Sequence, residues 1–246
     1  MSLGPDVAQT RRIREQIESL LREPRRLGPD FAPIHSLSDG ALVGYKATGR
    51  GAEGTAVGDT LSLLAGARSL GLVERLDWAF RALAIENMLS RPALELHVTP
   101  EPETYLTPCP PRLAGAISRG NRDLRIAAEI HEDAFAPGIS LAAGVAEIRS
   151  WGWKIVLADV ADDDRALSGA AAIKPDVVQI DLRRAGRADS DEHHGVQRLH
   201  AIAEQSGAAI MAVGVDSPNA RERAASVGAT LARGDDFGFP GALPEA

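Results

Sequence analysis

The chain has 246 residues and a formal net charge of −7, and 44% of its residues are hydrophobic and 25% are charged. This composition is typical of a soluble globular protein, and the acidic balance argues against binding to nucleic acid or to an anionic membrane. The single cysteine, Cys109, excludes an intramolecular disulfide, and no apolar run approaches the roughly 20 residues of a membrane span, so we expect a cytoplasmic protein.

The first 25 residues are predicted to form an N-terminal connector that contains one amphipathic helix, within residues 5–23. Apolar residues recur there at the spacing of a single helix face, with arginine and glutamate around the rest. They are Ile13, Ile17, Leu20 and Leu21. We expect this helix either to pack on the domain that follows, residues 26–246, or to pair with a partner or with its own copy.

Short apolar runs alternate with helix-like segments over the rest of the chain. The predicted strands are residues 31–37, 42–49, 93–98, 124–130, 154–160, 176–182, 208–215 and 229–234. The predicted helices between them include residues 72–89, 140–152, 191–207 and 217–228. This alternation favours a parallel sheet covered on both faces, and eight strands in this length favour an α/β fold of the (β/α)8 TIM-like barrel type. Only a short turn joins the first two strands, so one of them should run antiparallel to the others.

Polar residues fall at the C-terminal ends of the predicted strands, where barrels of this type carry their functional sites. They are Lys46, Arg50, His97, Glu129, Asp159, Gln179, Asp181, Asp216 and Arg233. A single polar residue at a strand end is more often structural than functional. The convergence of all of them on one mouth predicts a binding site without defining its chemistry.

Several segments together resemble one known family. They are FAPIHSLSDGALVGYKATGR (31–50), LGLVERLDWA (70–79), LHVTPE (96–101), IAAEIHED (126–133), WKIVLADVADDDRALSGAAAIKPDVVQIDL (153–182) and AIMAVGVDSPNARERAASVGATLARGDDFGFP (209–240). In their order and spacing these segments resemble the motifs of the EAL domain, the family of cyclic di-GMP-specific phosphodiesterases. The resemblance implies a TIM-like barrel with one antiparallel strand, which agrees with the pattern of predicted strands.

The resemblance also implies a metal site, because active members of the family hold two divalent cations, magnesium or manganese, that activate a water for attack on a phosphodiester. Position by position, most of the metal-binding residues are replaced here. Lys46 stands at the glutamate of the EAL signature, His97 at the asparagine ligand, Ala158 at the bridging aspartate, Val213 at the late glutamate, Gln179 at the water-orienting lysine and Arg233 at the late glutamine. Glu129 and Asp159 are the carboxylates that remain.

Hard dications need several negatively charged oxygens to offset their dehydration, and a lysine among the ligands adds a repelling charge. We therefore expect a catalytically degenerate domain without a metal cofactor. Lys46 is then either an internal counter-ion of Glu129 and Asp159 or, with Arg233 and Arg50, a contact for the phosphates of an anionic ligand. The resemblance identifies Arg50 as the arginine that contacts the nucleotide phosphate, and Gln179 and Asp181 would lie in the same mouth.

Three functions follow from this pattern. The first is a signalling module that acts through an unidentified protein partner or through metal-independent binding of cyclic di-GMP, and the resemblance also implies that the domain can form a homodimer. The second is residual phosphodiesterase activity from a rebuilt metal site of His97, Glu129 and Asp159. The third is new chemistry with Lys46 as a Schiff-base or general-base lysine. A depressed Lys46 pKa would favour the third, and a salt bridge to Glu129 would oppose it.

Overall fold

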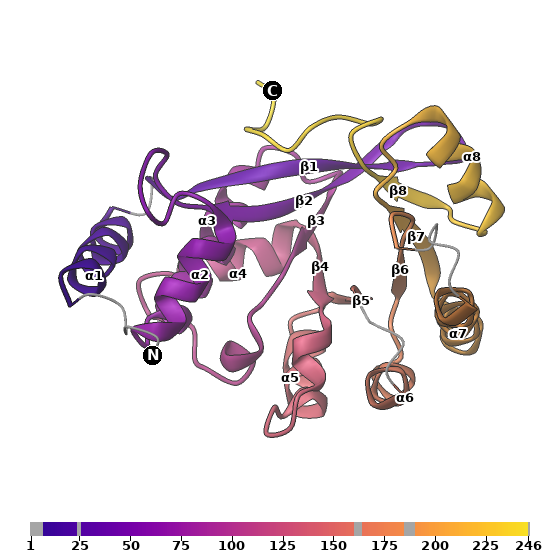
Figure 1. Cartoon of the computed structure of the whole chain (residues 1–246). Coiled ribbons are helices and arrows are strands. Elements are labelled where there is room, and N and C mark those ends of the chain that lie inside the picture. Colours follow the sequence, from indigo (N-terminus) through magenta and orange to yellow (C-terminus); the bar gives the residue numbers. More distant parts are fainter. Residues whose placement is uncertain (1–6, 24–25, 160–163, 185–189, 246) are drawn as a thin grey trace.

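A computed structural model describes residues 7–23, 26–159, 164–184 and 190–245, and within them eight strands close into a barrel with helices around it (Figure 1). The strands are β1 (Gly28–Ser36), β2 (Leu42–Arg50), β3 (Glu95–Val98), β4 (Arg125–Ile130), β5 (Lys154–Leu157), β6 (Val177–Asp181), β7 (Ala209–Val213) and β8 (Leu231–Arg233). They follow one another around the barrel in chain order. The predicted TIM-like barrel is confirmed.

Helices cover the outside of the barrel. They are α1 (Val7–Arg22), α2 (Thr60–Ser69), α3 (Val73–Met88), α4 (Ala114–Asp123), α5 (Leu141–Ser150), α6 (Asp164–Ile173), α7 (Ser190–Ser206) and α8 (Pro218–Ser226). Two short 3₁₀ helices, η2 (Pro102–Thr104) and η3 (Glu132–Phe135), follow β3 and β4. Within the described part of the chain, no helix has the length and apolar character needed to cross a membrane.

The antiparallel strand is β1, which pairs antiparallel with both β2 and β8, while the neighbours from β2 to β8 pair in parallel. The short turn after β1 dictates this, because two strands joined so closely can only run in opposite directions. β1 and β2 continue beyond the barrel: the pairing of β2 with β3 ends at Lys46, whereas its pairing with β1 reaches Arg50. The C-terminal segment then lies along β1, where Gly241 bridges to Phe31 (Figure 1).

The alternation of side chains along each strand separates two cores. Inside the barrel, Val177 of β6 belongs to a buried apolar cluster with Val156 and Met211. The adjacent Val178 and Ile180 instead belong to the large cluster that the strands form with the covering helices. Parallel strands buried on both faces read as continuous apolar runs, which is why the strands were recognisable in the sequence.

The N-terminal helix α1 packs on the barrel's helical layer beside α2 (Figure 1). Ile17, Leu20 and Leu21 are at most 2% exposed and share an apolar cluster with residues of α2 and α3. The face that could have met a partner is therefore occupied within this chain. Residues 24–25, where the connector was predicted to end, lie outside the described residues, and the division into residues 1–25 and 26–246 stays a prediction.

Candidate functional site

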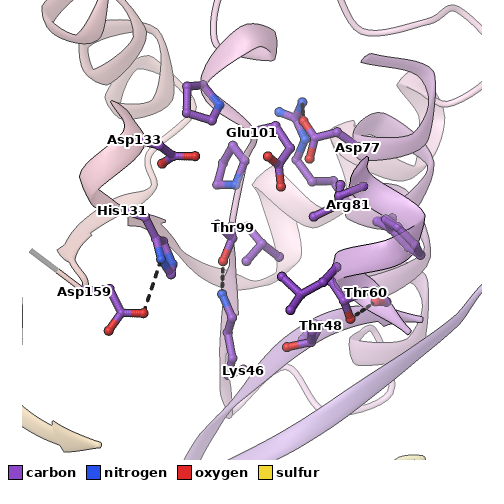
Figure 2. A pocket seen from close by; sticks show the side chains of 18 of the residues that line it. Lys46, Thr48, Thr60, Asp77, Arg81, Thr99, Glu101, His131, Asp133 and Asp159 are labelled. Carbon is purple, nitrogen blue, oxygen red and sulfur yellow. Dashed lines mark hydrogen bonds and ion pairs between the residues drawn. The ribbon is translucent and has the colours of Figure 1, made fainter. Parts of the chain in front are cut away.

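A pocket of about 740 Å³ opens at the C-terminal ends of the barrel strands. The ends of β2 and β3, the helices α2 and α3, and the segment that follows β4 supply most of its lining (Figure 2). The opening lies where the strand-end rule for barrels predicts it.

Lys46 projects from β2 into this pocket and pairs with a carboxylate from the barrel interior. Its Nζ lies 2.9 Å from Oε2 of Glu129 and also donates a hydrogen bond to Oγ1 of Thr99 (Figure 2). The side chains of Lys46 and Glu129 are 10% and 1% exposed, so water contributes little to their solvation. A buried charge needs a partner of opposite sign, and each of these two residues supplies it to the other.

Glu129 is the centre of a larger network. Its Oε1 accepts from Nη1 of Arg233 at 3.3 Å and faces Nδ1 of His97 at 3.2 Å, while Nε2 of His131 lies 3.7 Å from Oε2. Burial opposes ionisation, but the positive charges of Lys46 and Arg233 and the nearby ring nitrogens of the two histidines hold the pKa of Glu129 well below its usual value. Glu129 is therefore a carboxylate whose oxygens both face cationic or hydrogen-bonding groups.

The network continues down the barrel interior through His97. The two ring nitrogens of His97 each lie 3.2 Å from a carboxylate oxygen, one from Glu129 and one from Glu95. Glu95 in turn pairs with Nζ of Lys154 at 2.6 Å. Burial works against ionisation of Glu95, yet the contacts with His97 and Lys154 lower its pKa to about 2. A chain of polar contacts, with an ion pair at each end, thus crosses the side of the barrel that β2, β3, β4 and β5 form.

Burial lowers the pKa of Lys46, and the charge of Glu129 offsets only part of this effect. Both features weighed in the sequence analysis are therefore present, the depressed pKa and the salt bridge. The salt bridge decides between them, because a nucleophilic lysine must present a free amine, and Nζ is held between Glu129 and Thr99.

Asp159 is the second carboxylate that remains at a metal-ligand position, and unlike Glu129 it is exposed. It has a positive φ of 49°, its side chain is 53% exposed, and its Oδ2 lies 3.7 Å from Nδ1 of His131 (Figure 2). His131 stands between Asp159 and Glu129, so the two carboxylates do not share Lys46 as a common counter-ion. Lys46 neutralises the buried one alone.

The other predicted binding residues divide into two groups. Arg233 joins Lys46 at Glu129, and Asp181 lines the pocket. Gln179 is 6% exposed and its Nε2 has no hydrogen-bond partner. Arg50, Gln179 and Arg233 are all outside the group of residues that line the described pocket, and Nε of Arg50 pairs with Oδ2 of Asp30 at 3.0 Å. The structure therefore brings Lys46 and Arg233 together and leaves Arg50 on the projecting β1–β2 pair.

The pocket wall also carries a charged group that was not predicted from the sequence. Asp77 and Arg81 of α3 form an ion pair that is 3% and 2% exposed, and the Arg81 guanidinium lies 3.7 Å from the centroid of the Trp78 ring. Next to them, burial and the charge of Asp77 raise the pKa of Glu101 to about 7. The ion pair could have been predicted, because Asp77 and Arg81 are opposite charges four residues apart in a mostly apolar part of the helix. The raised pKa of Glu101 could not.

The donor set does not fit the two divalent cations of active family members. In the part of the chain that the structure describes, no three His, Cys, Asp or Glu residues are grouped so that they could hold a metal ion. Ala158 and Val213 offer no oxygen, and the oxygens of Glu129 already face Lys46, Arg233 and His97. A cation here would have to displace an ammonium group and a guanidinium group.

Comparisons with known proteins agree with the barrel fold. The family model of the EAL domain matches residues 11–240. The chain is similar to the FimX EAL domain of Xanthomonas citri in complex with c-diGMP, at 18% identity and a TM-score of 0.79 over 97% of each chain. It is similar to PaMucR phosphodiesterase in a c-di-GMP complex, at 18% identity and a TM-score of 0.72 over 92% of this chain and 97% of that one.

A third similar structure is the Bacillus subtilis YkuI protein, which has an EAL domain and is in complex with the substrate c-di-GMP and calcium. The identity is 18% and the TM-score 0.73, over 94% of this chain and 60% of that one. Likenesses at this level of identity establish the fold. No curated protein matches the sequence.

Proposed function

The chain belongs to the EAL domain family, and from this premise we propose that it is a catalytically degenerate signalling domain. It acts through contacts with a protein partner, through metal-independent binding of cyclic di-GMP or a similar anionic ligand, or through both. The partner is not identified, and a second copy of the chain is one candidate.

The ion pair between Lys46 and Glu129 carries this proposal. An ammonium group placed 2.9 Å from the buried carboxylate provides the charge that a metal ion would otherwise provide. It provides no coordination site for a water, so it cannot lower the pKa of a bound water as a metal does. The pocket therefore keeps a positive group for recognition and loses the group that generates the nucleophile.

The charges of the pocket lining favour protein contacts over tight binding of a free dianion. Six carboxylates line the described pocket against four cationic side chains. The carboxylates are Asp77, Glu101, Glu132, Asp133, Asp159 and Asp181, and the cations are Lys46, Arg68, Arg81 and Arg184. Phosphates would have to bind close to Lys46 and Arg233, with Gln179 and Asp181 beside them and Arg50 released from Asp30.

Calorimetric titration with cyclic di-GMP tests the proposal, first in chelator and then with magnesium or manganese. If the domain binds the nucleotide, we expect the same heat with and without metal, and weaker binding in Lys46→Ala, Arg233→Ala and Arg50→Ala. Arg75→Ala, which removes an exposed arginine of α3 outside the pocket lining, is the matched control and should bind as the unmodified protein does.

The other outcomes separate the parts of the proposal. No heat under any condition removes nucleotide binding and leaves protein contacts as the function. Binding that requires metal, followed by release of linear product, would overturn the degenerate assignment and favour a phosphodiesterase that uses His97, Glu129 and Asp159.

A further inference from the structure

The pocket has two walls of different character. Apolar side chains of α2 and α3 line one of them, and they are Leu61, Leu64, Phe80 and Ala84. Leu61 is 81% exposed, so this apolar wall continues from the pocket onto its rim. The ends of β4, β5 and β6 and the segments after them form the acidic wall, where the carboxylates are Glu132, Asp133, Asp159 and Asp181. In Figure 2, Asp133 and Asp159 lie on the side opposite Thr60 and Arg81.

Contacts with the end of β2 hold the apolar wall in place. Oγ1 of Thr60, the first residue of α2, donates a hydrogen bond of 2.5 Å to the carbonyl oxygen of Gly49. The ring of Phe80 in α3 packs directly on Gly49, where a Cβ would lie 2.5 Å from the ring atoms. A wall that the fold itself positions needs little ordering when a ligand binds.

On the acidic wall, Glu132 and Asp133 keep negative charge that the cations of the pocket lining offset little. Lys46 and Arg81 are already paired with buried carboxylates. Asp133 is 58% exposed and lies 4.0 Å from Nη2 of Arg68, whose guanidinium donates hydrogen bonds to two other carboxylates. Glu132 is exposed and has no ion-pair partner among the residues that the structure describes.

A ligand that contacts both walls must carry an apolar group and a cation close together. An anion finds no partner on either wall. A protein segment in which a leucine or an aromatic residue lies close to a lysine or an arginine satisfies both of them. A pocket of about 740 Å³ admits a few side chains and no folded domain, so the partner must enter it as a short segment.

We propose that the pocket is the docking site for a short basic and apolar segment of a protein partner. The apolar side chain of this segment lies on Leu61 and Phe80, and its lysine or arginine faces Glu132 and Asp133. The inference rests on the proposed function and names the kind of partner for it. Because the same pocket contains Lys46, a docked segment competes with cyclic di-GMP for the mouth of the barrel.

Selection of a displayed library of random peptides on the unmodified domain tests the docking site. We expect the selected peptides to combine a leucine or an aromatic residue with a nearby lysine or arginine, and to bind more weakly as salt is added. Leu61→Ser should weaken a selected peptide about tenfold. Glu132→Gln combined with Asp133→Asn should also weaken it about tenfold and should flatten its salt dependence. All three residues are exposed, so these variants should keep the Tm of the unmodified protein.

Leu106→Ser and Glu74→Gln are the matched controls, because both residues are exposed and lie outside the pocket lining. Both should bind the peptide as the unmodified domain does. The docking site is overturned if no peptide is enriched, if acidic peptides are enriched, or if the pocket variants bind as tightly as the controls. The proposed function fails on a different result, which is metal-dependent turnover of cyclic di-GMP.

Discussion

At the scale of single residues, Lys46 changes what the barrel mouth can hold. A glutamate at that position would place a second carboxylate beside Glu129, and both would repel each other until a cation bound between them. The lysine turns this repulsion into an attraction at 2.9 Å. The charge of Glu129 is then offset by a side chain of the same chain.

This pairing predicts strong coupling between Lys46 and Glu129. Lys46→Met removes the ammonium group from the buried Glu129, and Glu129→Gln leaves the buried Lys46 without its carboxylate, so each should lower the free energy of unfolding by about 3–5 kcal/mol. The double variant should cost less than the sum of the two, with a coupling energy of about 1–3 kcal/mol in urea unfolding at neutral pH. Additive costs would show that the two groups do not form a pair in solution.

The same carboxylate predicts how stability depends on acid. The pKa of Glu129 in the folded protein lies well below the ordinary 4.5, so its contribution is present above about pH 4.5 and is lost as the pH falls toward the folded value. Urea unfolding at a series of pH values should show this loss in the unmodified protein. Glu129→Gln should show a shallower slope, with the contribution of Glu95 remaining until the pH approaches about 2. An unchanged slope would contradict the assignment.

At the scale of secondary-structure elements, the strands were predictable because burial on both faces leaves continuous apolar runs. The helices α2, α4 and α6 were not named in advance, because glycine and other small residues weaken their pattern. Gly66 in α2 illustrates the cause: a Cβ at this position would lie 3.0 Å from Cγ2 of Ile13. The absence of a side chain at Gly66 lets α1 pack close to α2. This packing cannot be predicted from the sequence of either helix alone.

The candidate site, like the fold, was predictable only in part. The strand-end rule placed Lys46, His97, Glu129 and Arg233 in one mouth, and the other three all contact Glu129. Arg50 stands apart from Glu129, because β2 continues past the end of β3 and its last residues pair with β1 alone, and its role in binding stays a prediction. The rule could not find Arg68 or Glu101, since these lie on a helix and in a loop rather than at a strand end.

The close packing of α4 on α3 gives an element-scale prediction. Gly120 of α4 faces Ile85, and a Cβ there would lie 2.6 Å from Cγ2 of that side chain. Gly120→Ala should therefore destabilise the protein by about 1–3 kcal/mol, although alanine is the better helix former. Gly115→Ala in the same helix is the matched control, because its nearest neighbour is Nη1 of Arg119 at 3.7 Å. Urea unfolding should show a gain of up to about 1 kcal/mol for it.

The packing of α1 gives a second prediction at the scale of secondary-structure elements. Leu21 is 1% exposed in the cluster that α1 shares with α2 and α3. Leu21→Ala should lower the free energy of unfolding of the barrel by about 2–5 kcal/mol. Arg14→Ala, on an exposed position of the same helix, should change it by less than about 0.5 kcal/mol. If both variants unfold like the unmodified protein, α1 is a separable connector.

At the scale of the whole molecule, the barrel interior combines two kinds of packing. One part is apolar, with Val156, Val177 and Met211 in contact. The other carries the chain of polar contacts from Lys154 through Glu95, His97 and Glu129 to Lys46. Lys154 and Lys46 each face a carboxylate of this chain, Glu95 and Glu129, so polar contacts take the place of apolar packing on this side of the interior.

The contacts of Glu129 with Lys46 and Arg233 predict how the thermal unfolding of the whole domain responds to metal. A ligand that binds only the folded state raises the Tm, and the rise grows with the logarithm of its concentration relative to its Kd. Because Lys46 and Arg233 already face Glu129, we expect manganese, magnesium and chelator to leave the Tm of the unmodified protein unchanged. Lys46→Glu removes the ammonium and adds a carboxylate beside Glu129 and His97, so its Tm should be lower in chelator and should rise with manganese. Lys46→Met lacks both charges and should show no such rise. A manganese-dependent rise in the unmodified protein would mean that Lys46 leaves Glu129 when a metal binds, and the domain would then have to be regarded as a metalloprotein.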